Sequence, residues 1–318
     1  MQMALANIAK KSSAIKIGKK KYERDTVFWS YAMISTELIG FFAFTLYPIL
    51  WALRLSWFSY DGIPSNTRFI GWSNFINIFT NDVTYWKAVL TTFQFALIKI
   101  PMEIPFALFL AIILSKKLKG TGFFRTMFFM PNVVSVAIIG LIFSNMFSHF
   151  GVINRLLSDA GLISENVGWF DNKWTALFSV AFTDTWHTFG INLLYFLSAL
   201  NNVPEEIYES AKLDGAGRVA TFFKITLPCI APVFQIILMM SIIGTLGTSD
   251  IILVMTGGAP GGQTFTMMPY MTSKFVPGFA ETSANIGYGC SIAIVTALIT
   301  VIITLIYNKA SKRISSMY

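Results

Sequence analysis

Long apolar stretches alternate with short polar ones along most of the chain. Six apolar stretches reach or exceed the roughly 20 residues that a helix needs to cross the hydrocarbon core of a bilayer. They lie near residues 38–58, 88–114, 127–147, 176–200, 229–255 and 286–307. The strands of a membrane barrel would instead alternate in segments of about ten residues. The pattern therefore predicts an all-α membrane protein with six transmembrane helices.

Composition agrees with this class. Of the 318 residues, 54% are hydrophobic and 13% are charged, whereas a soluble globular chain carries about 25% charged residues. The two cysteines, Cys229 and Cys290, are isolated and lie near predicted spans. We interpret both as small apolar side chains, because no partner spacing predicts a disulfide.

The basic residues indicate how the helices are oriented, since cytoplasmic segments of a membrane protein hold the excess of Lys and Arg. The amino-terminal tail, the second loop, the fourth loop and the carboxyl end carry seven, four, three and three, against five in the other loops together. Both termini are therefore expected in the cytoplasm, with residues 1–30 as a basic tail and 31–318 as one six-span domain. Topology and anionic lipid account for the net charge of +8, so nucleic acid is not needed as a partner.

The fourth loop, residues 203–228, is polar and is interrupted by Gly and Pro. A short helix is expected up to Leu213, and Gly215 allows the backbone to turn with positive φ. A second helical piece then follows, and Leu227-Pro228 is expected to end it. The result is a cytoplasmic two-helix elbow with a face that could enter a groove on a partner. That exposed face is predicted to hold Ile207, Tyr208, Ala211 and Leu213. From chemistry alone, an amphipathic loop that packs on its own bundle is equally compatible.

The elbow resembles the EAA loop of binding-protein-dependent ABC importers, through Glu209, Ala211, Gly215 and the terminal Leu-Pro pair. Residues 69–75, 125–132 and 256–260 resemble further segments of sugar permeases of this family, although Ala259 replaces a glycine. In the family this loop is the coupling helix that docks on a cytoplasmic ATPase. The resemblance implies that contact for Glu209, Ala211, Asp214, Gly215, Leu227 and Pro228.

The resemblance also implies a function. The chain would be a multi-pass permease subunit in the cell membrane that translocates a sugar or oligosaccharide. Its implied partners are a second homologous permease, a dimer of ATP-binding cassette ATPases, an external solute-binding protein and membrane lipid. It would perform no covalent catalysis and hold no cofactor, because ATP is bound by the partner subunits only.

Two motifs that could suggest other chemistry do not support it. Residues 257–264, GGAPGGQT, imitate a phosphate-binding loop, but Gln263 stands where that loop needs its lysine. The histidines, His149 and His187, are alone, without the spacing of metal ligands. No ATP or metal site is therefore expected in the chain.

Two polar stripes follow predicted spans. Asp184, His187 and Thr188 share one face of the fourth span, and Ser241, Thr245 and Thr248 share one face of the fifth. Hydroxyl-matching groups beside aromatic rings suit a sugar, although Ser and Thr also mediate close packing of membrane helices. Similarity to maltose-type permeases implies a sugar cavity at the following positions: Asn132, Asp184, His187, Thr188, Ser241, Thr245 and Thr248.

Lys99 and Glu103 are charged residues in the middle of the second span, at i and i+4. We favour a structural ion pair over a substrate contact. Two alternative functions stay open at this point. One is an ABC permease for another polar solute such as glycerol phosphate. The other is an ion-coupled secondary transporter, in which Lys99, Glu103, Asp184 and His187 would form a relay.

Overall fold

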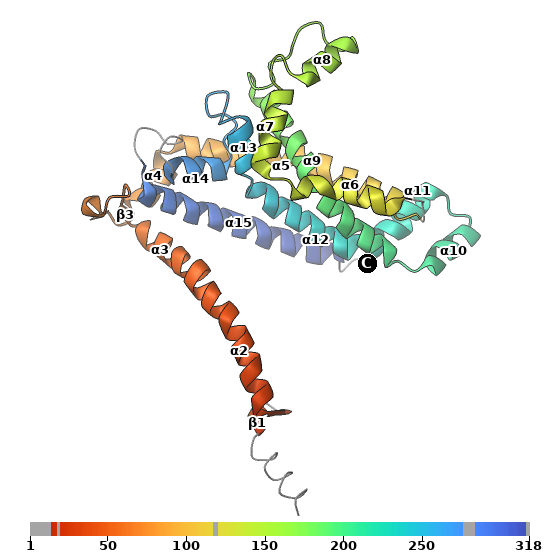
Figure 1. The fold of residues 1–318 in the computed structure, drawn as a ribbon, viewed down its shortest axis with the longest axis horizontal. Helices are drawn as coiled ribbons and strands as arrows, with labels where there is room; N and C mark the ends of the chain where they lie inside the picture. The colour runs from red at the N-terminus through yellow and green to blue at the C-terminus, as the bar shows by residue number, and fades with distance from the viewer. Residues whose placement is uncertain (1–13, 18–19, 117–119, 276–283, 316–318) are drawn as a thin grey trace, which may run out of the picture.

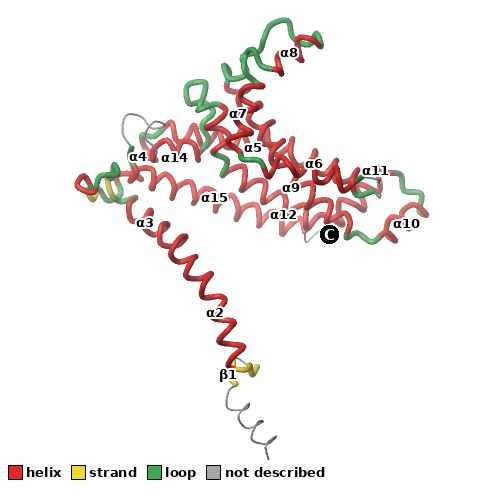
Figure 2. Tube along the Cα trace, viewed as in Figure 1, coloured by secondary structure: helices red, strands yellow, loops and turns green. Residues whose placement is uncertain are grey.

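The computed structural model describes residues 14–17, 20–116, 120–275 and 284–315. Much of the predicted basic tail therefore lies outside the described residues. Helices dominate the described part of the chain (Figures 1 and 2). Two short antiparallel pairs depart from the all-helical prediction. They are β1 (Ala14–Ile17) with β2 (Lys20–Glu23), and β3 (Phe58–Ser59) with β4 (Arg68–Phe69).

Four helical segments of the described chain are long and apolar enough to cross a membrane. The first combines α2 (Arg24–Phe41), a π turn (Phe42–Leu46) and α3 (Tyr47–Leu55). The others are α5 (Val83–Leu114), the run of α11 (Arg218–Thr221), a second π turn (Phe222–Thr226) and α12 (Leu227–Leu246), and α15 (Ile286–Ser315). Two helices bent against each other, α6 (Thr121–Val133) and α7 (Val136–Met146), could form a fifth span.

The helix α9 (Lys173–Asn201) corresponds to the remaining predicted stretch. It has 29 residues, about as many as the segments above. Polar residues interrupt its apolar sequence, so α9 is not among the segments apolar enough to be assigned as spans. Figure 1 shows α9 in the bundle, close to α5 and α6.

The span predicted near residues 127–147 consists of two helices rather than one. The axes of α6 and α7 differ by 94°, because Val134 and Ser135 have extended backbones, with ψ of 142° and 131°. The β-branched pair Val133-Val134 disfavours helix at this point. The length of the apolar stretch carries no information about such a break.

The prediction that Leu227-Pro228 ends the elbow is also wrong. The chain stays helical because the π turn just before Pro228 shifts the hydrogen-bond pattern, so that the Leu227 N–H donates to the carbonyl of Phe222. A proline lacks the N–H that a regular α-helix would need there. The first helix repeats the arrangement, with the Tyr47 N–H bonded to Phe42 O ahead of Pro48.

The fifth predicted stretch ends earlier than residue 255. The helix α12 ends at Leu246, and residues 247–249 separate it from α13 (Asp250–Met255). The shorter elements are the 3₁₀ turn η2 (Pro64–Asn66), α4 (Ser73–Thr80), α8 (Val152–Asp159), α10 (Glu205–Leu213) and α14 (Met267–Phe275). In Figure 1, α10 lies at one end of the bundle and α4 with β3 at the other.

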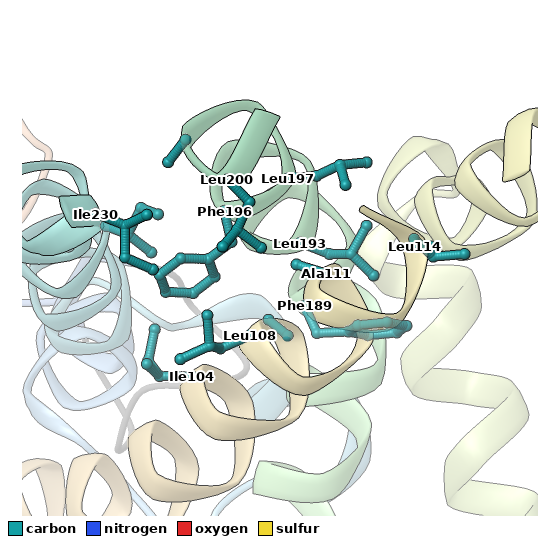
Figure 3. Close-up of a cluster of buried hydrophobic side chains, with 13 residues drawn as sticks. Ile104, Leu108, Ala111, Leu114, Phe189, Leu193, Phe196, Leu197, Leu200 and Ile230 are labelled. Atoms are coloured by element: carbon teal, nitrogen blue, oxygen red, sulfur yellow. The ribbon is translucent and has the colours of Figure 1, made fainter. Parts of the chain in front are cut away.

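The core of the bundle forms where α9 packs between α5, α6 and α12. Phe189, Leu193 and Phe196 of α9 are buried against Ile104 of α5 and Ile230 of α12 (Figure 3). The helix α6 crosses α9 at Gly190, where a Cβ atom would lie 2.1 Å from the carbonyl oxygen of Phe128. The backbones therefore approach as closely as small residues permit in membrane helix pairs.

The first helix differs from the others because only its last part, α3, contacts the bundle, through α15, whereas α2 does not. None of the most apolar window of Val27–Leu55 is buried, and Figure 1 shows α2 running away from the remaining helices. Apolar side chains on all sides of a helix are stable in lipid or against a partner helix.

Candidate functional site

A cavity of about 430 Å³ opens between α5, α9, α12 and the start of α13. Its wall is polar where the three long helices face one another. The lining residues are Lys99, Glu103, Val136, Asp184, His187, Thr188, Ile191, Asn192, Tyr195, Met240, Ser241, Gly244, Gly247, Thr248, Ser249, Asp250 and Ile251.

Three charged side chains meet at the wall of this cavity. The Lys99 Nζ lies 2.7 Å from Asp184 Oδ2 and 3.7 Å from Glu103 Oε2. All three residues are at most 5% exposed. Lys99 and Glu103 thus form the predicted pair, but Asp184 of α9 is the closer partner of the ammonium group. The ion pair joins α5 to α9, which the i, i+4 spacing did not reveal.

Neutral polar groups extend the contact to α12. Glu103 Oε1 accepts hydrogen bonds from Thr188 Oγ1 at 2.7 Å and from Asn192 Nδ2 at 2.9 Å. The Asn192 amide also donates to Ser241 Oγ at 3.0 Å, and Thr248 Oγ1 lies 3.5 Å from Asp184 Oδ2. One connected polar network therefore ties three long helices around the cavity.

Five of the seven predicted substrate residues line the cavity: Asp184, His187, Thr188, Ser241 and Thr248. The other two do not. Asn132 lies in the last turn of α6 and is not part of the wall. Thr245 is fully buried and donates to the carbonyl of Ser241. The hydroxyl of Thr245 is therefore bonded within its own helix and does not face the cavity.

Several lining residues were not predicted from the sequence. Asn192 and Tyr195 lie eight and eleven positions after Asp184 and continue its stripe at the helical period. Extending the stripe by two turns would have found them. Asp250 is at the wall because the chain breaks before α13. No periodic pattern in the sequence indicates that Asp250 lies there.

The elbow residues divide into exposed and buried ones. Glu209 and Asp214 are exposed, and Gly215 has a φ of +75° that ends α10. Leu213 is 89% exposed. Ala211 is buried at 5% exposure, so its predicted place on the exposed face is wrong. On α10 it points toward the chain itself, whereas Leu227 and Pro228 lie within the continuous helix.

Comparison with known proteins gives the family. Residues 103–316 match the family described as "Binding-protein-dependent transport system inner membrane component". The probable ABC transporter permease protein YesP of Bacillus subtilis is 36% identical over 88% of this chain and 89% of its own. The lactose transport system permease protein LacF of Rhizobium radiobacter is 33% identical, over 89% and 93%. The arabinooligosaccharides permease AraP of Halalkalibacterium halodurans is 34% identical, over 86% and 85%.

Solved structures with the same fold are also known. A bacterial ABC transporter for import of the acidic polysaccharide alginate aligns with a TM-score of 0.78 over 92% of this chain and 97% of its own, at 22% identity. A second structure of a bacterial alginate ABC transporter, in complex with an alginate pentasaccharide-bound periplasmic protein, aligns with a TM-score of 0.77 at 21% identity. The fold and the sequence matches agree, and the chain belongs to the inner membrane components of binding-protein-dependent transport systems.

Proposed function

We propose that this chain is the six-span permease subunit of an ABC importer that translocates a sugar or oligosaccharide. The observation that carries the proposal is the cavity between α5, α9 and α12, whose wall carries hydroxyl, amide and carboxylate groups. Such groups match sugar hydroxyls as donors and acceptors. Relatives named for lactose and arabinooligosaccharides support the substrate class. In this proposal α9 is the sixth span, and its polar stripe is tolerated because it faces the cavity rather than lipid.

Energy and substrate would come from partners. The subunit itself performs no covalent catalysis and holds no cofactor. We infer a second homologous permease, a pair of ATPases that bind ATP on the cytoplasmic side, and an external binding protein. The alginate transporter in complex with its periplasmic protein supports the last of these. The elbow, with exposed Glu209 and Leu213, is the proposed contact for one ATPase.

Transport would follow alternating access of the cavity to the two sides of the membrane. The elbow leads through α11 and the second π turn directly into α12. Ser241 and Thr248 of the cavity wall lie on or directly after that helix. Closure of the paired ATPases would therefore shift one wall of the cavity relative to α9. Both termini are proposed to be cytoplasmic, on the side of the elbow.

The test is reconstitution with the neighbouring subunits and measurement of ATP-dependent uptake across mono- and oligosaccharides. Loss of one partner from a buried polar contact typically costs about 1–3 kcal/mol, so Asp184→Ala and Thr248→Val should weaken uptake by roughly 5- to 150-fold. Thr304→Val is the matched control, because Thr304 also donates to the carbonyl four residues earlier but does not line the cavity. Equal uptake by all three variants and the wild type would mean that the polar stripes only pack helices.

The same assay separates the alternative functions. The meeting of Lys99, Glu103 and Asp184 in one cavity is the observation that favours an ion-coupled relay. Uptake that persists without ATP and follows an ion gradient would support that class. Stimulation by glycerol phosphate, without stimulation by any sugar, would support a different polar solute.

A further inference from the structure

The cavity carries more negative than positive charge. Three carboxylates line it, those of Glu103, Asp184 and Asp250, and Lys99 is the one basic residue other than histidine among the described residues of the wall. Its ammonium group is already held by Asp184 at 2.7 Å. A ligand that enters the cavity therefore meets carboxylates and no available ammonium or guanidinium group.

One carboxylate oxygen at this wall lacks a hydrogen-bond donor. Glu103 is 2% exposed, and its Oε2 atom is buried without a hydrogen-bond partner in the described structure. Its nearest cation, Lys99 Nζ, is 3.7 Å away, beyond hydrogen-bond distance. The other oxygen, Oε1, accepts two hydrogen bonds. A buried acceptor of this kind normally has a partner. A ligand hydroxyl could supply one if a small movement of the Glu103 side chain turned Oε2 toward the cavity, whose wall already includes Glu103.

We propose that Glu103 is a substrate-binding residue whose Oε2 accepts a substrate hydroxyl, and that the surplus of carboxylates makes the cavity select neutral sugars over uronates. This inference rests on the proposed sugar transport and deepens it. It replaces the interpretation of Glu103 as a purely structural partner of Lys99.

The physical basis is the difference between a hydroxyl and a carboxylate at the same place. A hydroxyl that donates to an ionised carboxylate forms a charge-assisted hydrogen bond, which is stronger than a neutral one. A uronate carboxylate would instead face Glu103 and Asp184 at close range, where water does not screen the repulsion well. Lys99 cannot compensate without leaving Asp184 unpaired in a buried place.

The experiment measures direct sugar binding to the whole transporter, purified in lipid nanodiscs. The binding protein is left out, so that its own sugar selectivity does not affect the result. The probes are matched pairs, galactobiose with digalacturonate and cellobiose with cellobiouronate, added to the wild type and to Glu103→Gln. In the wild type, the uronate of each pair should bind at least about tenfold more weakly than its neutral counterpart. In Glu103→Gln this gap, the ratio of the dissociation constants of the uronate and the neutral sugar, should shrink severalfold. The neutral sugar should also bind more weakly than it does to the wild type.

A second variant keeps the proposal testable if Glu103→Gln does not fold. Asp250 is exposed and lies at the start of α13, so Asp250→Asn removes a charge from the cavity wall without touching the buried network, and should narrow the gap by a smaller factor. Uronates that bind the wild type as well as the neutral sugars do would overturn the inference while leaving sugar transport intact. A gap unchanged in both variants would overturn it too. If no sugar of either kind binds, and none stimulates ATP hydrolysis in the complete system, the proposed function fails instead.

Discussion

Lys99 occupies a position that a lysine tolerates only with its partners in place. Lys99 is 4% exposed, and its ammonium group is neutralised by Asp184 across the α5–α9 contact. Taking such a group out of water costs several kcal/mol per ion, and the attraction between the charges offsets that cost only while both remain. The pair is thus an obligatory feature of this packing rather than an added source of stability.

Lys99→Met should therefore destabilise the protein by about 3–5 kcal/mol, because two buried carboxylates lose their counter-ion. The measurement is thermal unfolding of the purified subunit in detergent, together with its yield in the membrane. Lys99→Met combined with Asp184→Leu should recover part of the loss, since one of the carboxylates is removed with the lysine. A single variant as stable as the wild type would show that the carboxylates are already protonated.

Gly190 sets how closely α6 and α9 can approach. A Cβ atom at this position would lie 2.1 Å from a backbone oxygen of α6, so Gly190→Ala should force the helices apart and cost roughly 1–3 kcal/mol. The matched control is Gly122→Ala on α6, where nothing lies within 4 Å of the added atom. That control should be neutral or slightly stabilising, because alanine favours helix. Equal stabilities of the two variants would contradict a close crossing at Gly190.

At the scale of elements, the elbow depends on one backbone conformation. Gly215 has a φ of +75°, which proline cannot adopt and which strains any residue with a Cβ. Gly215→Pro should leave the subunit in the membrane but reduce ATPase capture and uptake by about tenfold or more, and Glu209→Lys should act in the same direction by reversing an exposed charge.

The control for this prediction lies two residues away. Gly217 has a φ of −70°, and a Cβ there would meet nothing within 4 Å, so Gly217→Ala should retain both activities. Pull-down of the ATPase together with uptake quantifies the two effects. Wild-type capture and transport by Gly215→Pro would show that the elbow is not the docking element.

Some elements could be predicted from the sequence because their signals are local. The apolar length of residues 88–114 placed α5 well, and Gly215 predicted the turn after α10. The break at Val134 was not predicted, because the length of an apolar stretch does not indicate where the backbone becomes extended. The helix that continues through Pro228 was not predicted, because it depends on a π turn. In the site, the helical spacing of Asp184, His187 and Thr188 predicted the polar stripe. The contact of Lys99 with Asp184 could not be predicted in this way, because the two residues are 85 positions apart in the chain.

At the scale of the whole molecule, the arrangement of the basic residues predicts which ends face the cytoplasm. A cysteine at Gly217 should react with a membrane-impermeant maleimide only after the cells are opened, and a cysteine at Ser65 should react in intact cells. Cys229 is exposed and must first be changed to alanine, whereas Cys290 is buried and can stay. Labelling of position 217 in intact cells would invert the topology and remove the proposed ATPase contact with it.

The unbroken helical run from Arg218 to Leu246 has a mechanical consequence. Its 29 residues span about 40 Å at the usual rise of about 1.5 Å per residue. Such a rod is a lever: a tilt of roughly 6° about the elbow end would displace the far end by about 4 Å, which exceeds the length of a hydrogen bond. The far end carries one wall of the cavity, so in the proposed mechanism a small tilt at the elbow would be enough to break or form individual hydrogen bonds in that wall. Regular hydrogen bonding along this run is interrupted at the π turn, Phe222–Thr226, and at Pro232, which has no N–H to donate. The stiffness of the helix at these two places would set how much of the displacement reaches the cavity.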